Sequence, residues 1–272
     1  MTLDLEKIES HRLSHPGLRE MIREILFFER VESTNRVALD MAADGMPGGL
    51  LILSDSQRKG KGRLDRPWFS PAGANLYFSL LLRPYLSPRD FPLFSMAASL
   101  ALCDSIHRAT GLHPEIKWPN DILIEEKKLA GILLESKTAG AETTPLIIGI
   151  GVNVNVGPDS FPTDLQKSAT SLKAVLGHPI DRTDLLNIIL EGLAEQVSLL
   201  QDGKKDLLIQ RIQKECATLG KKVRVNTLRQ EFEGFAEEID DDGALLLRMG
   251  DGRRRRIRIG DITHLREASG RN

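Results

Sequence analysis

The feature that most constrains the fold is a nearly uninterrupted apolar segment, LIIGIGVNV, at residues 146–154. Strands buried on both faces are continuously apolar, whereas half-exposed strands alternate apolar and polar residues. The segment therefore predicts a central strand in a sheet that is covered on both sides. Gly149 and Gly151 interrupt this strand, and glycine in a strand often marks a place where a ligand comes close.

Neighbouring segments predict the remaining layers of an α/β fold. A buried strand is expected at 50–54 and a further strand at 75–82. The apolar runs at 122–124 and 129–134 flank a polar EEKK sequence that is typical of a hairpin. Apolar residues three and four positions apart predict amphipathic helices after Pro88, and capping signals predict another helix near the N-terminus. The expected helices span residues 33–44, about 91–106, 182–202 and 204–218.

The last fifty or so residues have a different character. Short alternating stretches are separated by Asp242-Gly243 and Asp251-Gly252, dipeptides that favour tight hairpin turns, so a small separate β-barrel is predicted. The arginine run at 253–258 is interpreted as the outer face of a strand, with Ile257 and Ile259 inward and acidic residues 240–242 balancing the charge. We expect a helical lead at 1–26, a main domain at 27–219 and the barrel at 220–272.

Composition excludes several classes of protein. The 272 residues include 37 Lys plus Arg and 38 Asp plus Glu, so the net charge of −1 argues against a generic polyanion binder. The longest apolar runs are too short to span a bilayer, and no export signal is visible. Cys103 and Cys216 match neither a disulfide framework nor a metal-ligand spacing, and the six histidines form no metal-binding pattern. A cytoplasmic protein is expected.

A basic glycine-containing loop, QRKGKGRLDR at 57–66, is the first motif with chemical content. Gly60 and Gly62 let backbone amides approach an anion, and Lys61 and Arg63 supply positive charge for a phosphate. The loop is neither a Walker A sequence nor a dinucleotide fingerprint. Taken alone, it is more typical of a solvated surface loop.

Two further motifs lie near the predicted hairpin. In KWPND at 117–121, the proline fixes the direction of the chain before a strand, and Asp121 could take a magnesium ion or orient an amine. The alternative is a simple turn with Trp118 in the core. In KKLAGIL at 127–133, Lys128 becomes a fixed charge suited to a phosphorus centre if its neighbours bury its stem; otherwise it is an exposed lysine.

Two polar groups could contact a small ligand directly. Ser33, Thr34 and Asn35 either cap a helix or hydrogen-bond a polar molecule. Asn153 could recognise an adenine edge by donating and accepting hydrogen bonds at once.

In order along the chain, these motifs closely resemble those of the bacterial biotin protein ligases, in the short form without an N-terminal DNA-binding domain. The resemblance covers roughly residues 31–266. It rests on ESTN at 32–35, QRKGKGR at 57–63, RPWFSPAGANLYFSLLLRP at 66–84, KWPND at 117–121, KKLAGILLE at 127–135, IGIGVNVN at 148–155 and ATSL at 169–172. It implies an α/β catalytic domain on a mixed sheet, related to class II aminoacyl-tRNA synthetases, followed by an SH3-like barrel.

The resemblance also implies a reaction. ATP and biotin, with Mg²⁺, would give biotinyl-5′-AMP, and a lysine of the biotin carboxyl carrier protein of a carboxylase such as acetyl-CoA carboxylase would then accept biotin. The implied catalytic residues are Lys128, Arg63 and Asp121, with Asp121 as the candidate magnesium ligand.

The resemblance assigns ligand contacts to residues that match the family motifs. The implied biotin-binding residues are Ser33, Thr34, Asn35, Gln57, Gly60, Lys61, Gly62, Arg63, Lys128, Gly131, Gly149 and Gly151. The implied ATP- and adenylate-binding residues are Lys61, Arg63, Arg66, Trp68, Lys117, Asn120, Asp121, Lys128 and Asn153.

The loop departs from the family's frequent GRGRRGR sequence. Lys61 keeps the charge of an arginine without its planar fork, and Leu64-Asp65 replaces a base with an acid, which affects the grip on phosphate. The N-terminal segment is too short for a winged helix, so no DNA binding is expected. Monomer and homodimer both remain open.

Three alternatives remain. A lipoate or octanoate ligase would use the same chemistry, but polar groups at Ser33, Thr34 and Gln57 favour a ureido head over an aliphatic dithiolane. A nucleic-acid-binding module would use the 58–66 loop and the arginine-rich barrel, and its binding would depend steeply on salt. A paralogue that binds biotin without activating it is the third.

Overall fold

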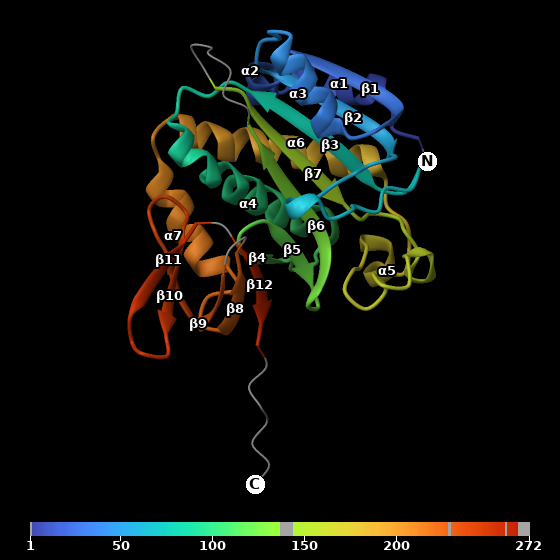
Figure 1. The fold of residues 1–272 in the computed structure, drawn as a ribbon. Coiled ribbons are helices and arrows are strands. Elements are labelled where there is room, and N and C mark those ends of the chain that lie inside the picture. Colours follow the sequence, from blue (N-terminus) through green and yellow to red (C-terminus); the bar gives the residue numbers. More distant parts are fainter. Residues whose placement is uncertain (1, 137–143, 228–229, 259, 266–272) are drawn as a thin grey trace.

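The computed structural model describes residues 2–136, 144–227, 230–258 and 260–265, and within them a seven-stranded mixed sheet forms the centre (Figure 1). The strand order is β1-β2-β3-β7-β6-β5-β4, with β1 and β2 parallel and the other pairs antiparallel. The strands are β1 (Glu24–Val31), β2 (Leu50–Gln57), β3 (Leu76–Leu82), β4 (Glu115–Lys117), β5 (Asp121–Ile124), β6 (Lys127–Glu135) and β7 (Leu146–Val152). The prediction that β7 is central is confirmed, although it ends two residues earlier than expected.

Helices cover both faces of this sheet. They are α1 (Leu5–Ser14), α2 (Pro16–Met21), α3 (Thr34–Ala43), α4 (Phe91–Thr110), α5 (Leu172–Leu176), α6 (Arg182–Gln201) and α7 (Lys205–Glu215). On β2, Leu51 and Leu53 join the core under α4 and α6, whereas Leu50 and Ile52 pack with the apolar side of α3. This alternation within one apolar strand explains why β2 is buried throughout. No helix of the described residues is long and apolar enough to cross a membrane.

The N-terminal helices are attached to the main domain. Leu18 and Ile22 are fully buried in the core, and Lys7 forms an ion pair with Asp184 of α6 at 2.5 Å. The strand β1 follows them directly and was not predicted, because its EILFFERV sequence carries charges at both ends of a short apolar run. The boundary expected at residue 26 lies inside this strand.

The C-terminal residues form a five-stranded antiparallel sheet of order β11-β10-β9-β8-β12 among the described positions. Its strands are β8 (Lys222–Asn226), β9 (Glu231–Ile239), β10 (Leu245–Met249), β11 (Arg254–Ile257) and β12 (Asp261–His264). The two predicted turns are confirmed, since Gly243 and Gly252 have φ of 84° and 81°. Ile257 is buried, whereas Ile259 lies outside the described residues. Arg258 pairs with Asp242 as expected.

The Trp118 side chain joins the sheet domain to this barrel. Trp118 is 2 % exposed, its Nε1 donates to the Gly243 carbonyl at 3.0 Å, and its backbone N–H donates to Thr218 Oγ1 at 3.1 Å. Trp118 is therefore a core residue, in agreement with the simpler of the two interpretations of its motif. In Figure 1 the barrel accordingly lies beside β4 and α7.

His264 at the end of β12 predicts a pH-dependent stability. Burial lowers its pKa to about 4, and Lys221 and Lys117 act in the same direction. Because the folded-state pKa lies below that of an unfolded histidine, near 6.5, the contribution is complete above pH 6.5 and is lost as the pH falls towards 4. For this half-buried ring we expect a loss of about 1 kcal/mol, after allowance for solvent screening.

Thermal denaturation between pH 7.5 and 4.5 measures this effect. His264→Gln should lose less stability over that range than the wild type, while His178→Gln, at an exposed histidine, should match the wild type. Equal losses in wild type and His264→Gln would refute the assignment.

Candidate active site

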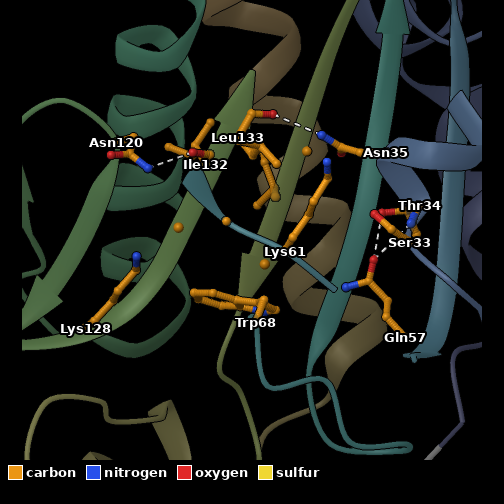
Figure 2. Close-up of a pocket in the computed structure, with 15 residues that line it drawn as sticks. Ser33, Thr34, Asn35, Gln57, Lys61, Trp68, Asn120, Lys128, Ile132 and Leu133 are labelled. Atoms are coloured by element: carbon orange, nitrogen blue, oxygen red, sulfur yellow. Dashed lines mark hydrogen bonds between the residues drawn. The ribbon is translucent and has the colours of Figure 1, made fainter. Parts of the chain in front are cut away.

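Two adjoining cavities lie where the edges of β2, β6 and β7 meet the basic loop and the first turn of α3. The first cavity is lined by Ser33, Thr34, Asn35, Gln57, Lys61, Gly62, Trp68, Asn120, Lys128, Gly131, Ile132, Leu133, Gly149, Ile150 and Gly151 (Figure 2). The second is lined mainly by Gly62, Arg63, Arg66, Trp68, Phe69, Lys117, Asn120, Asp121, Lys128, Asn153, Leu165, Ala169 and Asp261.

One end of the first cavity is a preorganised polar network. Gln57 Oε1 accepts the backbone N–H of Thr34 at 2.9 Å, and Gln57 Nε2 donates to Ser70 Oγ at 3.1 Å. Ser33 occupies the N-cap position of α3, but its side chain makes no capping hydrogen bond. Gln57 thus replaces Ser33 as the cap, which leaves the Ser33 hydroxyl at the cavity for a ligand.

Asn35 is held by protein partners at both ends of its carboxamide. Its Oδ1 accepts from Ser79 Oγ at 2.6 Å, and its Nδ2 donates to Glu135 Oε2 at 2.8 Å and to the Leu133 carbonyl at 3.3 Å. Ser79 is fully buried, and neither Ser79 nor Glu135 was predicted as a site residue. Asn35 therefore shapes the cavity wall, and its amide orientation is fixed before any ligand arrives.

The strand glycines make room for these side chains. A Cβ at Gly149 would overlap the Asn35 carboxamide, and a Cβ at Gly151 would lie 2.5 Å from Trp68 Nε1. The sequence predicted that both glycines mark close approach of a ligand. Both do line the first cavity, but the groups they approach are protein side chains that form its walls.

Lys61 extends into the first cavity. Figure 2 shows its side chain in the space between Asn35 and Trp68, and its Nζ lies 3.5 Å from Glu135 Oε1. The Glu135 carboxylate raises the pKa of Lys61. A charged ammonium at this place must move, or must bond to the ligand, when the cavity is filled.

Lys128 lies at the junction and lines both cavities, as do Gly62, Trp68 and Asn120. Its Nζ forms an ion pair with Asp121 Oδ1 at 2.6 Å and lies 5.3 Å from the centre of the Trp68 ring. The sequence left open whether this lysine is exposed or has a buried stem; in the structure its side chain is 33 % exposed. Its ammonium is therefore held where the two cavities meet.

The second cavity is lined by several charged side chains. Arg63 donates to Asn120 Oδ1 and to the Gly260 carbonyl, both at 3.1 Å, and Arg66 pairs with Asp261 at 2.7 Å. The basic loop is therefore attached to the C-terminal barrel. Burial lowers the pKa of Lys117, although the Asp121 carboxylate opposes the shift. Such a group of cations suits a polyphosphate.

The structure brings the predicted residues together in two groups. All residues assigned to biotin line the first cavity except Gly60 and Arg63, and Arg63 lies in the second. All residues assigned to ATP line the second cavity except Lys61, which lies in the first. Gly60 contributes indirectly, since a Cβ there would lie 2.6 Å from Ser70 Oγ behind the cavity wall.

The geometry defines a class of protein. One cavity has a polar end and apolar walls, the other is lined by cations, and a lysine joins them. This suits a small acid whose polar head enters the first cavity and whose carboxylate meets a nucleotide phosphate at Lys128. The fold and site are those of an acid-activating ligase.

Comparison with known proteins identifies the family. Residues 27–153 match the Biotin/lipoate A/B protein ligase family, and residues 218–265 match the Biotin protein ligase C terminal domain. The Bacillus subtilis bifunctional ligase/repressor BirA is 35% identical over 233 residues, covering 85% of this chain and 71% of that protein. The Paracoccus denitrificans biotin–[acetyl-CoA-carboxylase] ligase is 35% identical, covering 82% of this chain and 94% of its own.

Solved structures agree. The Aquifex aeolicus biotin protein ligase in complex with biotin and ATP has a TM-score of 0.76 and 27% identity, and the match covers 90% of this chain and 100% of that one. The chain belongs to the biotin protein ligase family. The fold expected from the sequence, a mixed α/β domain with a small C-terminal β-domain, is confirmed.

Proposed function

We propose that the protein activates biotin with ATP and transfers it to a lysine of the biotin carboxyl carrier protein of acetyl-CoA carboxylase or a related carboxylase. The observation that carries this proposal is the junction at Lys128 between a cavity for a polar-headed acid and a cavity for phosphates. The relatives named as biotin–[acetyl-CoA-carboxylase] ligases and the neighbour that binds biotin and ATP support it.

In the first step, a carboxylate oxygen of biotin attacks the α-phosphorus of ATP, and the bond from that phosphorus to pyrophosphate breaks. Lys128 is placed to bind both the carboxylate and the α-phosphate, which reduces their mutual repulsion. Asp121 holds the Lys128 ammonium until the substrates arrive. Arg63, Arg66 and Lys117 would bind the remaining phosphate charge.

Magnesium fits this site through Asp121. Mg²⁺ is usually held by one or two carboxylates together with substrate phosphates, and Asp121 is a carboxylate on the second cavity. The ion would neutralise charge on the pyrophosphate group.

In the second step, the carrier lysine amine attacks the acyl carbon of the mixed anhydride, AMP leaves with the bond electrons, and the amine loses a proton. The basic loop, fixed to the barrel through Arg63 and Arg66, would keep water from the anhydride until the lysine arrives. We place this chemistry in the cytoplasm, where ATP is available.

Pyrophosphate exchange into ATP, with biotin, lipoate or octanoate as the added acid, tests the proposal. Exchange that requires biotin is expected, because the Ser33 hydroxyl, which lines the first cavity and makes no capping hydrogen bond, would lack a partner against an aliphatic head. Exchange with lipoate or octanoate instead would assign the protein to the related ligases. Absence of exchange with every acid would contradict the proposal.

A prediction concerns the loop. Arg63→Ala should still form the adenylate but should release AMP without a carrier about tenfold faster, since the loop loses contacts worth roughly 1.4 kcal/mol. Carrier-free AMP release is the measurement. Arg58→Ala, at an exposed arginine of the same loop, is the control and should behave as wild type. Unchanged release in Arg63→Ala would show that Arg63 does not retain the intermediate.

We further propose that α1 and α2 serve the ligase domain and do not bind DNA, although several relatives are named ligase/repressors. Their buried residues pack into the core, and both Lys7 and His11 are engaged with carboxylates of α6. Gel-shift titration should accordingly find no salt-sensitive DNA binding by this chain.

A further inference from the structure

Asn153 has a fixed place in the wall of the second cavity. It follows β7 by one residue and is 4 % exposed, and its backbone is held on both sides. Its N–H donates to the Leu129 carbonyl at 2.9 Å, and its own carbonyl accepts from Leu172 at 3.1 Å. The only freedom left to the residue lies in its side chain, and chiefly in which end of the carboxamide faces the cavity.

Asn75 decides that orientation. It is fully buried, one residue before β3, and its Oδ1 accepts the backbone N–H of Val154 at 2.8 Å. Because a backbone N–H can only donate, the Asn75 atom facing it must be the oxygen. Asn75 Nδ2 is then directed to Asn153, and it donates to Asn153 Oδ1 at 3.3 Å. The Asn153 oxygen is therefore drawn into the protein, and its Nδ2 is left for the cavity.

We propose that Asn75 is a positioning residue for nucleobase selection: it orients Asn153 so that the amide N–H groups donate to a ring nitrogen of adenine. The inference rests on the proposed function, which places ATP in the second cavity. The ring nitrogens N1, N3 and N7 of adenine carry lone pairs, so a donor attracts them and a carbonyl oxygen repels them. The sequence alone left Asn153 free to donate and accept at once, whereas the structure assigns it the role of donor.

The test compares ATP with its 1-deaza, 3-deaza and 7-deaza analogues in biotin-dependent pyrophosphate exchange. In the wild type, the analogue that lacks the contacted nitrogen should lose about tenfold in kcat/KM, since it leaves a buried donor unpaired. The other two analogues should be used nearly as well as ATP. Three deaza analogues used equally well by the wild type would overturn the inference.

Asn75→Asp reverses the orientation. An aspartate still accepts the Val154 N–H, but its second oxygen can only accept, so Asn153 must turn its Nδ2 inward and present Oδ1 to the base. The kcat/KM for ATP should fall about tenfold. The deaza penalty, meaning the loss of kcat/KM when the analogue without the contacted nitrogen replaces ATP, should disappear. If the variant lost as much kcat/KM with that analogue as the wild type does, the positioning role would be refuted. Simple damage to the fold would instead lower kcat/KM for all four nucleotides by the same factor.

Two further variants complete the experiment. Asn155→Asp is the matched control, because the Asn155 carboxamide bonds only to the backbone of Ile180 among the described residues; it should keep the wild-type pattern. Asn153→Asp keeps the bond from Asn75 and turns an oxygen to the cavity, so it should lose the deaza penalty even if Asn75→Asp fails to fold. Absence of exchange with every nucleotide in the wild type would overturn the proposed function itself.

Discussion

Replacing Lys128 with alanine should lower biotin-dependent pyrophosphate exchange by roughly 100- to 1,000-fold, the usual effect of losing one group that stabilises developing charge. Among the described residues, Lys128 is the cation that lines both cavities, so no neighbour can bridge a carboxylate in one and a phosphate in the other. Its removal also leaves the Asp121 carboxylate, now 2.6 Å from the Lys128 ammonium, without this partner beside incoming phosphates. The Asp121 carboxylate would then repel the phosphates, in addition to the loss of the attraction between Lys128 and the phosphates.

Two variants separate this role from general damage. Lys127→Ala removes the adjacent lysine, which is exposed and lines neither cavity, and it should retain exchange within about twofold. Lys128→Arg keeps the charge on a longer, planar group and should recover only part of the rate. Biotin binding measured by calorimetry should fall far less than exchange in Lys128→Ala. Exchange close to wild type in that variant would remove Lys128 from the chemical step.

The fold was predictable where a local sequence pattern by itself required a particular environment or backbone conformation in the folded protein. A continuous apolar run required burial on both faces, and β7 is the middle strand. The Asp-Gly pairs required positive φ, and both occur at turns of the barrel. By contrast, β1 was missed because its short apolar run is flanked by charges, and only pairing with β2 and packing against neighbouring helices make it a strand.

The sequence pointed to most of the residues that line the two cavities, but not to the residues that support them. Ser79, Glu135 and Asn75 act on Thr34, Asn35 and Asn153 across the sheet. Nothing local distinguishes a serine or an asparagine in a strand that orients a partner from one that simply tolerates burial. Such roles depend on strand register, which follows from the whole sheet rather than from any one segment.

Asp261 is a supporting residue that could not be predicted because its contact lies between the two domains. It lies on β12 and pairs with Arg66 of the basic loop, nearly two hundred residues earlier in the chain. The sequence predicted a barrel and a loop separately, but the contact depends on how the barrel docks around Trp118. Within the loop, Asp65, the acid that departs from the family sequence, lies 3.4 Å from the Lys61 ammonium.

Gly149→Ala should abolish measurable biotin binding, because the added methyl group would overlap the Asn35 carboxamide. The backbone cannot yield, because Gly149 lies on the central strand, paired with Ser79 on one side and Leu133 on the other. The Asn35 carboxamide can yield only by breaking its hydrogen bonds with Ser79 and Glu135. Asn35 must therefore leave its place and disrupt the polar end of the first cavity. We also expect a loss of about 1–3 kcal/mol in the free energy of unfolding.

Calorimetric titration with biotin and chemical denaturation together measure both effects. Gly157→Ala is the matched control, since a Cβ there meets only Ser160 Oγ at 3.4 Å, and it should change neither quantity appreciably. Adding Asn35→Ala to Gly149→Ala should restore most of the stability by removing the overlap, but it should not restore biotin binding, because the wall of the cavity is then missing. Recovery of binding in that double variant would show that Asn35 has no part in forming the site.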